Sequence, residues 1–182
     1  MNIYFENYNI APIHEKDAWR LCDFMVSNSD RFKDFFPGTL KENLNPTLSR
    51  HFVAKKVKEF NEKEEFLFTV KENTNRAIIG LIYVKELKKK EGQGELAYCI
   101  GYQYAGKGLM TKIVDKIVRW SFDDANLDTL QIIAHQTNVA SKKVAEKNNF
   151  TWQKTLPKVH EIPGVGFVDM ELYELYSDKK IE

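Results

Sequence analysis

The chain has 182 residues, in which 27 lysines and arginines balance 26 acidic residues, so a general nucleic-acid-binding role is not expected. No apolar run approaches the ~20 residues of a membrane span, and the N-terminus lacks the basic and apolar parts of a signal peptide. Two cysteines, Cys22 and Cys99, lie inside apolar patterns rather than a disulfide framework, which favours a cytoplasmic, reduced protein. With the balanced charge and the lack of a long apolar run, we expect neither nucleic-acid nor membrane partners.

The first third of the chain predicts one strand and two helices. We expect a strand at residues 3–10 and then an amphipathic helix within residues 15–28, whose apolar side chains recur at helical spacing. Residues 29–43 are rich in aromatic side chains without a period, and Pro37-Gly38 predicts a turn there. Asn45 followed by Pro46 is typical of a helix start, and that helix should continue to Phe60.

The remaining residues predict a sheet with one helical crossover. We expect strands at residues 65–70, 77–87 and 95–100, a helix at 109–122, a strand at 127–135, a helix at 138–149, and a closing antiparallel pair at 150–156 and 167–175. This order predicts an α/β (α+β) fold, with a mixed, mostly antiparallel sheet of about seven strands flanked by about four helices. No repeat or linker interrupts the pattern, so we expect a single domain over residues 1–182.

A glycine-rich loop, GYQYAGKGLM at residues 101–110, joins the predicted strand at 95–100 to the helix that follows. It is not a Walker A loop, because Lys107 is followed by Gly108 rather than by Ser or Thr. It fits a dinucleotide fingerprint poorly, because only Gly106 and Gly108 match. A strand-to-helix loop of this kind can bind an anion through its backbone N–H groups, and a tight turn without a ligand explains the glycines equally well.

A second motif, NVASKKVAEKNNF, follows one strand later. With QYAGKG at this separation and in this topology, the chain resembles the GNAT superfamily of acyl-CoA-dependent N-acetyltransferases. The segment GELAYCIGYQYAGKG is most similar to the branch that includes the ribosomal-protein N-terminal acetyltransferases. That branch also contains relatives that modify antibiotics, spermidine and amino acids, so the acceptor stays open.

The resemblance implies that acetyl-CoA is the co-substrate and that its pyrophosphate binds at the glycine loop. Its pantetheine arm would lie between the strands at 95–100 and 127–135, which splay apart in this family. Lys143 would approach the adenosine 3′-phosphate, unless it is only a solvated surface lysine. The cofactor-binding residues so implied are Ile100, Gln103, Tyr104, Ala105, Gly106, Lys107, Gly108, Leu109, Asn138, Ser141 and Lys143.

The resemblance also implies catalytic roles. Glu95 stands where relatives often place a general base that works through water, although a solvated glutamate at a strand end is the plainer alternative. The Ile100 N–H is a candidate oxyanion donor, and Ser141 a candidate hydrogen-bond donor to the cofactor sulfur. Ala145 occupies the position of the usual tyrosine acid, and Asn149 replaces a glycine that ends the helix, where asparagine also tolerates the left-handed conformation.

The acceptor is expected to be a primary amine, either a protein N-terminus or a small molecule, bound by Asp30, Phe35 and Glu95. The phenylalanines of this segment also fit an ordinary packed connection between helices. No spacing of histidines suggests a metal site, and the protein is expected to be a monomer or homodimer. The alternative to an enzyme is a GNAT-fold module that binds or senses acyl-CoA without turnover. The missing tyrosine leaves this alternative open, whereas Glu95 and Ser141 argue against it.

Overall fold

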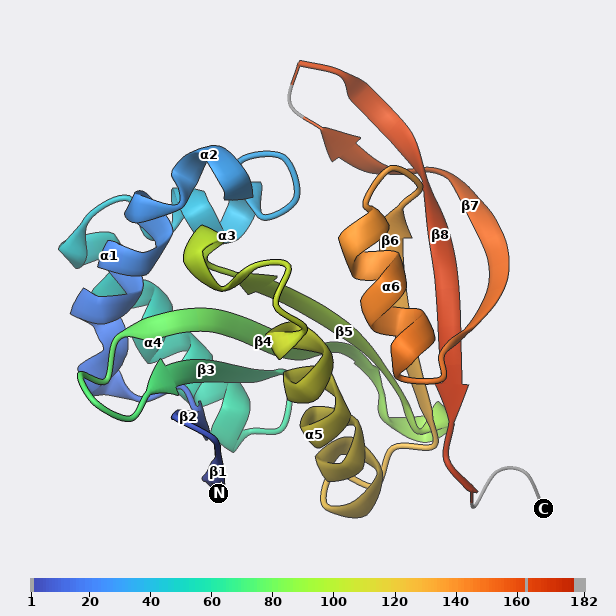
Figure 1. Ribbon diagram of the computed structural model, residues 1–182, viewed down its shortest axis with the longest axis horizontal. Coiled ribbons are helices and arrows are strands. Elements are labelled where there is room, and N and C mark those ends of the chain that lie inside the picture. Colours follow the sequence, from blue (N-terminus) through green and yellow to red (C-terminus); the bar gives the residue numbers. More distant parts are fainter. Residues whose placement is uncertain (1, 163, 179–182) are drawn as a thin grey trace. The chain divides into compact units, whose positions relative to one another are not determined.

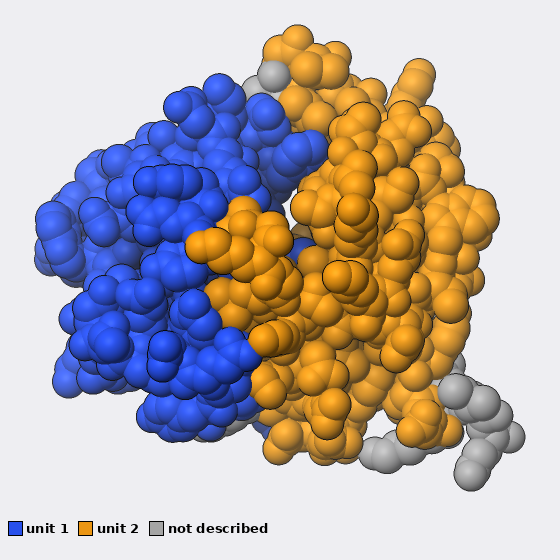
Figure 2. Space-filling view, in the orientation of Figure 1, with its two compact units in different colours: residues 1–83, 98–104 blue, residues 84–97, 105–182 orange. Residues whose placement is uncertain are grey.

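The computed structural model describes residues 2–162 and 164–178 (Figure 1), and the chain falls into two compact units. Unit 1 comprises residues 1–83 and 98–104, and unit 2 comprises residues 84–97 and 105–182 (Figure 2). The strands are β1 (Ile3–Phe5), β2 (Tyr8–Pro12), β3 (Phe66–Glu72), β4 (Ile78–Lys88), β5 (Gln93–Ile100), β6 (Thr129–His135), β7 (Thr151–Ile162) and β8 (Gly166–Tyr176). The α-helices are α1 (Ala18–Ser27), α2 (Ser29–Phe32), α3 (Pro37–Lys41), α4 (Pro46–Asn61), α5 (Leu109–Asp123) and α6 (Val139–Lys147).

The sheet of the described residues has eight strands, hydrogen-bonded in the order β1-β2-β3-β4-β5-β6-β8-β7. The pairs β1–β2, β2–β3, β6–β8 and β7–β8 are antiparallel, whereas β5 pairs with β6 in parallel. This confirms the predicted mixed, mostly antiparallel α/β fold, with one strand and two short helices more than expected.

The additional strand comes from a hairpin at the N-terminus. The predicted strand at 3–10 is wrong as a single element, because the chain turns after Phe5 and pairs Phe5 with Tyr8. Glu6 turns the chain in the left-handed region, at φ 49°. A turn of this kind is normally signalled by Asn-Gly or Asp-Gly, and here no glycine marks it.

The additional helices lie in the aromatic connection of unit 1, residues 29–43. Phe32, in α2, is only 2% exposed and packs against the rings of Phe24 and Phe36. Pro37-Gly38 does not form the predicted turn but begins α3, because proline is well tolerated at the first helical position. Helices of four and five residues are too short to show a period in the sequence.

Helix α4 begins as predicted. The Asn45 side chain accepts a hydrogen bond from the Leu48 N–H at 3.0 Å, and Pro46 is the first helical residue. At the other end of α4, Phe60 packs edge-on against Phe66 and Phe68 of β3, with ring centroids 5.1 and 5.2 Å apart. These contacts hold the helix on the strand within unit 1.

In unit 2, α5 connects β5 to β6, as parallel pairing of the two strands requires. Its predicted apolar stripe is confirmed, since Ile113, Val114 and Ile117 are fully buried. Helix α6 ends near Asn149, whose φ of 63° is the left-handed conformation expected at that position. The closing hairpin β7–β8 is present, and Pro163 between its strands lies outside the described residues.

Within the described part of the chain, no helix is both long and apolar enough to cross a membrane.

Both cysteines are buried in unit 1, which makes their thiols poor nucleophiles. Burial raises the pKa of Cys99 to about 12, and Cys22 is 7% exposed. We therefore expect neither thiol of the folded protein to react with Ellman's reagent over minutes at pH 8, whereas both react at once in guanidinium chloride. Rapid release of one equivalent of thionitrobenzoate from the folded protein would contradict this placement.

Candidate active site

The glycine loop between β5 and α5 has a backbone that only glycine adopts easily. Gly106 and Gly108 have φ values of 75° and 74°. A Cβ atom built at either position would meet no heavy atom within 4 Å, so the space beside the loop is open. Lys107 between them is exposed. The loop therefore combines a left-handed backbone with room for a ligand against it.

The N-terminus of α5, which follows this loop, has neither a capping side chain nor an acidic residue in its first turn. Its N-cap residue, Gly108, has no side chain to accept a hydrogen bond, and the first helical turn contains no acidic residue. The N–H groups of the first turn, beginning at Leu109, therefore need acceptors from outside the helix, and the helix dipole gives them a partial positive charge. A phosphate or pyrophosphate group satisfies both requirements.

Tyr104 anchors the start of the loop within unit 1. Its hydroxyl donates to the Glu72 Oε1 atom at 2.7 Å, and its ring packs edge-on against Tyr8. Burial, together with this hydrogen bond, raises the pKa of Tyr104 to about 12, so the hydroxyl keeps its proton. The side chain of Gln103 donates to the Tyr102 hydroxyl at 3.1 Å. The side chains of Tyr104 and Gln103 are thus engaged within the protein. In the predicted cofactor site, these two residues would contribute their main-chain groups.

The end of β5 is held by two residues of unit 1, Arg31 in α2 and Asn28 between α1 and α2. The Arg31 Nε atom donates to the Ile100 carbonyl at 3.1 Å, and the Asn28 Oδ1 atom accepts from the Tyr102 N–H at 3.1 Å. These bonds fix the main chain around Ile100, the predicted oxyanion donor. Sequence patterns could not reveal them, because 69 and 74 residues separate the partners.

The N-terminus of α6 has the predicted cap. The Asn138 Oδ1 atom accepts from the Ser141 N–H at 3.1 Å. Ser141 is half-buried and Lys143 is exposed. Ala145 is fully buried, so a tyrosine at this position would have to enter the core. Position 145 therefore supplies no general acid for the leaving thiolate.

A hydrogen bond fixes α6 to the first turns of α5. The Asn148 Nδ2 atom donates to the Thr111 carbonyl at 3.2 Å, and also to the Val144 carbonyl at 2.8 Å. Asn148 is 9% exposed, so its amide makes these bonds away from bulk water. The two helices that carry the predicted cofactor-binding residues of unit 2 are therefore linked directly.

Glu95 lies where the pairing of β5 with β6 stops. The parallel register runs from Gln93↔Thr129 to Glu95↔Gln131, although β5 continues to Ile100. The Glu95 carboxylate pairs with the Lys85 ammonium at 3.1 Å, and its side chain is 15% exposed. Glu95 is thus a partly buried carboxylate beside a cation, at the end of a three-pair ladder.

A row of polar side chains continues from this point across the sheet of unit 2. Gln93 donates to Gln131 at 3.1 Å, and Gln131 donates to Glu174 at 2.6 Å. The Tyr176 hydroxyl also donates to Glu174. The hydrogen bond to Glu174, followed by burial, raises the pKa of Tyr176. Sequence reasoning missed this row, because its partners are 38 and 43 residues apart in the chain. It missed Lys85 because the ion pair with Glu95 depends on how the neighbouring strands β4 and β5 are placed against each other.

The two predicted acceptor-binding residues apart from Glu95 are in unit 1. The Asp30 side chain is 99% exposed and forms an ion pair with Lys33 at 3.3 Å, which leaves it accessible to solvent. Phe35 is half-buried. Among residues 2–162 and 164–178, no group of three or more His, Cys, Asp or Glu side chains is arranged to hold a metal ion.

A profile of the acetyltransferase (GNAT) domain matches residues 8–151 of the chain. The chain belongs to the GNAT acetyltransferase family. The protein is therefore an acetyl-CoA-dependent acetyltransferase, which confirms the predicted family, reaction class and acyl donor.

Several relatives of this GNAT protein carry the names of ribosomal-protein acetyltransferases, the branch that the sequence resembles. YdaF of Bacillus subtilis (strain 168), which carries the name of a putative ribosomal N-acetyltransferase, is 25% identical over 153 residues, covering 80% of this chain and 78% of YdaF. The crystal structure of ribosomal-protein-S5-alanine acetyltransferase from Vibrio fischeri matches with a TM-score of 0.92 and 22% identity, covering 98% of this chain and 97% of that one. The ribosomal L7/L12 acetyltransferase RimL in complex with coenzyme A matches with a TM-score of 0.89 and 13% identity, covering 98% and 99%.

Mutation of the glycine loop tests whether the loop binds coenzyme A. Gly106→Glu places a carboxylate beside the uncapped start of α5, so we expect it to raise the Kd of coenzyme A about tenfold or more in calorimetry. Gly164→Glu is a matched control, because Gly164 has a similar φ of 79° and equally open space. It introduces the same backbone strain and charge elsewhere. Equal affinities of the two variants would refute the assignment of the loop.

Proposed function

We propose that the protein transfers the acetyl group of acetyl-CoA to the N-terminal amine of a ribosomal protein in the cytoplasm. The amine attacks the thioester directly, within a complex that holds both substrates. The names of the relatives support this acceptor class, since YdaF, the Vibrio fischeri enzyme and RimL are all named for ribosomal acetylation. The family profile covers residues 8–151 and so includes residues of both units, which supports a single catalytic domain over residues 1–182.

The cofactor is proposed to bind mainly through backbone groups. The open backbone at Gly106 and Gly108 and the uncapped N–H groups of α5 would hold the pyrophosphate. Gln103, Tyr104, Ala105, Lys107 and Leu109 would contribute main-chain contacts or charge around it. Asn138 is proposed to hydrogen-bond the pantetheine through its amide nitrogen, because its Oδ1 atom already caps α6. Lys143 is exposed and so able to reach the 3′-phosphate.

The observation that carries the proposal is the partly buried Glu95 at the end of the β5–β6 ladder. The β5–β6 register ends there, and the pantetheine arm is proposed to run along β6 beyond this point. A carboxylate placed there can accept the amine proton through a water molecule. Lys85 is proposed to position the carboxylate rather than to take part in the reaction, since it holds Glu95 from β4 at 3.1 Å.

In the proposed reaction, the acetyl group moves from the thioester sulfur to the amine nitrogen. The amine, after losing its ammonium proton to Glu95 through water, attacks the thioester carbonyl carbon and forms the C–N bond. The oxyanion of the tetrahedral intermediate accepts a hydrogen bond from the Ile100 N–H, which Arg31 and Asn28 hold in place. The C–S bond breaks and the thiolate accepts a hydrogen bond from Ser141. One of the two protons on the attacking nitrogen leaves to solvent, the other stays as the amide N–H, and Glu95 releases its proton to water. Coenzyme A is released as thiolate or thiol.

The proposed acceptor is tested with a thiol-release assay on purified protein and acetyl-CoA. The acceptors are peptides with the N-terminal sequences of the organism's ribosomal proteins, the same peptides with blocked N-termini, polyamines, aminoglycosides and free amino acids. We expect release with free-N-terminal peptides only, and mass spectrometry should place the acetyl group on the α-amine. Turnover of only small amines would refute the acceptor, and tight acetyl-CoA binding without turnover of any amine would favour a non-catalytic module.

Glu95→Gln tests the proposed base. We expect kcat to fall about 100-fold, because glutamine cannot accept a proton, and its pH dependence to flatten. The Kd of acetyl-CoA should not change. Glu91→Gln is the control, since Glu91 is an exposed glutamate in the turn before β5 and should leave kcat unaltered. A wild-type kcat in Glu95→Gln would exclude this role.

A further inference from the structure

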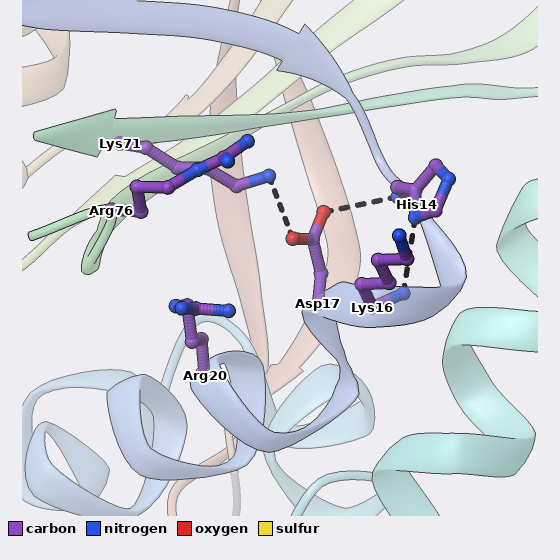
Figure 3. Close-up of a pocket in the computed structure, with 6 residues that line it drawn as sticks. All are labelled: His14, Lys16, Asp17, Arg20, Lys71 and Arg76. Carbon is purple, nitrogen blue, oxygen red and sulfur yellow. Dashed lines mark hydrogen bonds and ion pairs between the residues drawn. The ribbon is translucent and has the colours of Figure 1, made fainter. Parts of the chain in front are cut away.

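Unit 1 contains a basic pocket that none of the proposed catalytic or cofactor-binding residues line. Its volume is about 400 Å³, and the lining residues come from the segment after β2, from α1, from the end of β3 and from the turn that follows it. Figure 3 shows Lys71 and Arg76 on one side of the space beside Asp17, and Arg20 on another. The six lining residues, here called the basic pocket, are His14, Lys16, Asp17, Arg20, Lys71 and Arg76.

The single carboxylate of the basic pocket is already occupied. One oxygen of Asp17 pairs with the Lys71 ammonium at 2.6 Å, and the other accepts from the His14 N–H at 3.0 Å. The side chains of this ion pair are 5% and 10% exposed, so the pair is part of the wall of the pocket. Asp17 therefore neutralises Lys71, and both of its oxygens already have a partner.

The other cations of the basic pocket have no such partner. Across the described ranges, no carboxylate lies within 4.0 Å of the charged atoms of Lys16, Arg20 or Arg76. The pocket has four cationic side chains against one carboxylate, whereas the whole chain has a net charge of only +1. The positive charge is thus concentrated locally, and repulsion among these side chains falls when an anion binds between them.

We propose that the basic pocket binds the phosphate group of a small phosphorylated molecule, or free phosphate. A guanidinium group presents parallel N–H donors that match two oxygens of a phosphate, and Arg20 and Arg76 supply two such groups from different segments. Lys16 adds a flexible point charge. The buried Asp17–Lys71 pair holds the wall in place whether or not the ligand is bound.

The shape of the site favours a small ligand over a nucleic acid. The cations surround one space of about 400 Å³ instead of forming a stripe along which a phosphate backbone could run. No Phe, Tyr or Trp is among the residues that line the pocket, so bases have no such ring to stack on. The near-neutral chain offers little further attraction for a polyanion.

The test uses calorimetry on the full chain at constant ionic strength, with inorganic phosphate and glucose 6-phosphate as separate ligands and chloride as the background anion. We expect saturable binding of at least one of them to the wild type. Tighter binding of glucose 6-phosphate would identify an organic phosphate as the better ligand. Tighter binding of inorganic phosphate would identify the free ion as the better ligand. The double variant Arg20→Gln/Arg76→Gln should lose about tenfold or more in affinity, because both forks are gone.

Two further variants control for charge and folding. Arg50→Gln, at an exposed position of α4, removes a cation outside the pocket and should bind phosphate as the wild type does. Arg20→Lys/Arg76→Lys keeps the charge without the forks and should fall between wild type and the glutamine variant. All variants should retain the wild-type circular dichroism spectrum and acetyl-CoA affinity, so this test remains valid even if the proposed acceptor is wrong.

The following results would overturn the proposal. The first is phosphate binding that does not saturate, and the second is equal phosphate affinity in the glutamine variant and the wild type. The third is loss of acetyl-CoA affinity in the glutamine variant, which would make the pocket part of the cofactor site. Binding of a ten-nucleotide RNA without measurable binding of either small phosphate would instead indicate a nucleic-acid surface.

Discussion

The parallel pairing of β5 with β6 is the constraint from which the proposed chemistry follows. Two adjacent parallel strands cannot be joined by a tight turn, so the chain must cross over through a helix, here α5. A helix that directly follows β5 necessarily presents its N-terminus after the carboxyl end of that strand. The glycine loop leaves this N-terminus uncapped, and Glu95 marks the end of the ladder. The parallel pairing therefore places an uncapped helix N-terminus directly after the strand that carries Glu95.

Charge in this protein is managed locally, although the chain as a whole is almost neutral. Lys85 pairs with Glu95, and Lys71 pairs with the buried Asp17. In contrast, the start of α5 and the cations around Arg20 and Arg76 are left without internal counter-charges. Positive potential without an internal partner is the common feature of the proposed cofactor loop and the basic pocket. Net charge alone, which is +1, reveals neither.

Long periodic elements were predictable, and short ones were not. The stripe of α5, the Asn45 and Asn138 caps and the left-handed Asn149 all follow from local rules that the structure confirms. The β1–β2 hairpin was missed because no glycine marks its turn, and the helices α2 and α3 were missed because four and five residues are too few to show a repeating apolar pattern. In the candidate site, the loop conformation was predictable, whereas Lys85, Arg31 and the Gln93–Gln131–Glu174 row were not.

The sequence by itself determined the order of the longer elements, the glycine loop before α5 and the resemblance to GNAT acetyltransferases, since each depends on residues close together in the chain. The tertiary structure decided which side chains meet across strands and helices. It paired Glu95 with Lys85, tied Ile100 to Arg31, and gathered Arg20 and Arg76 around one pocket. The physical reason is that an ion pair or a shared cavity depends on distance in space. Local propensity specifies each strand and helix, but the register and packing between them bring distant residues together.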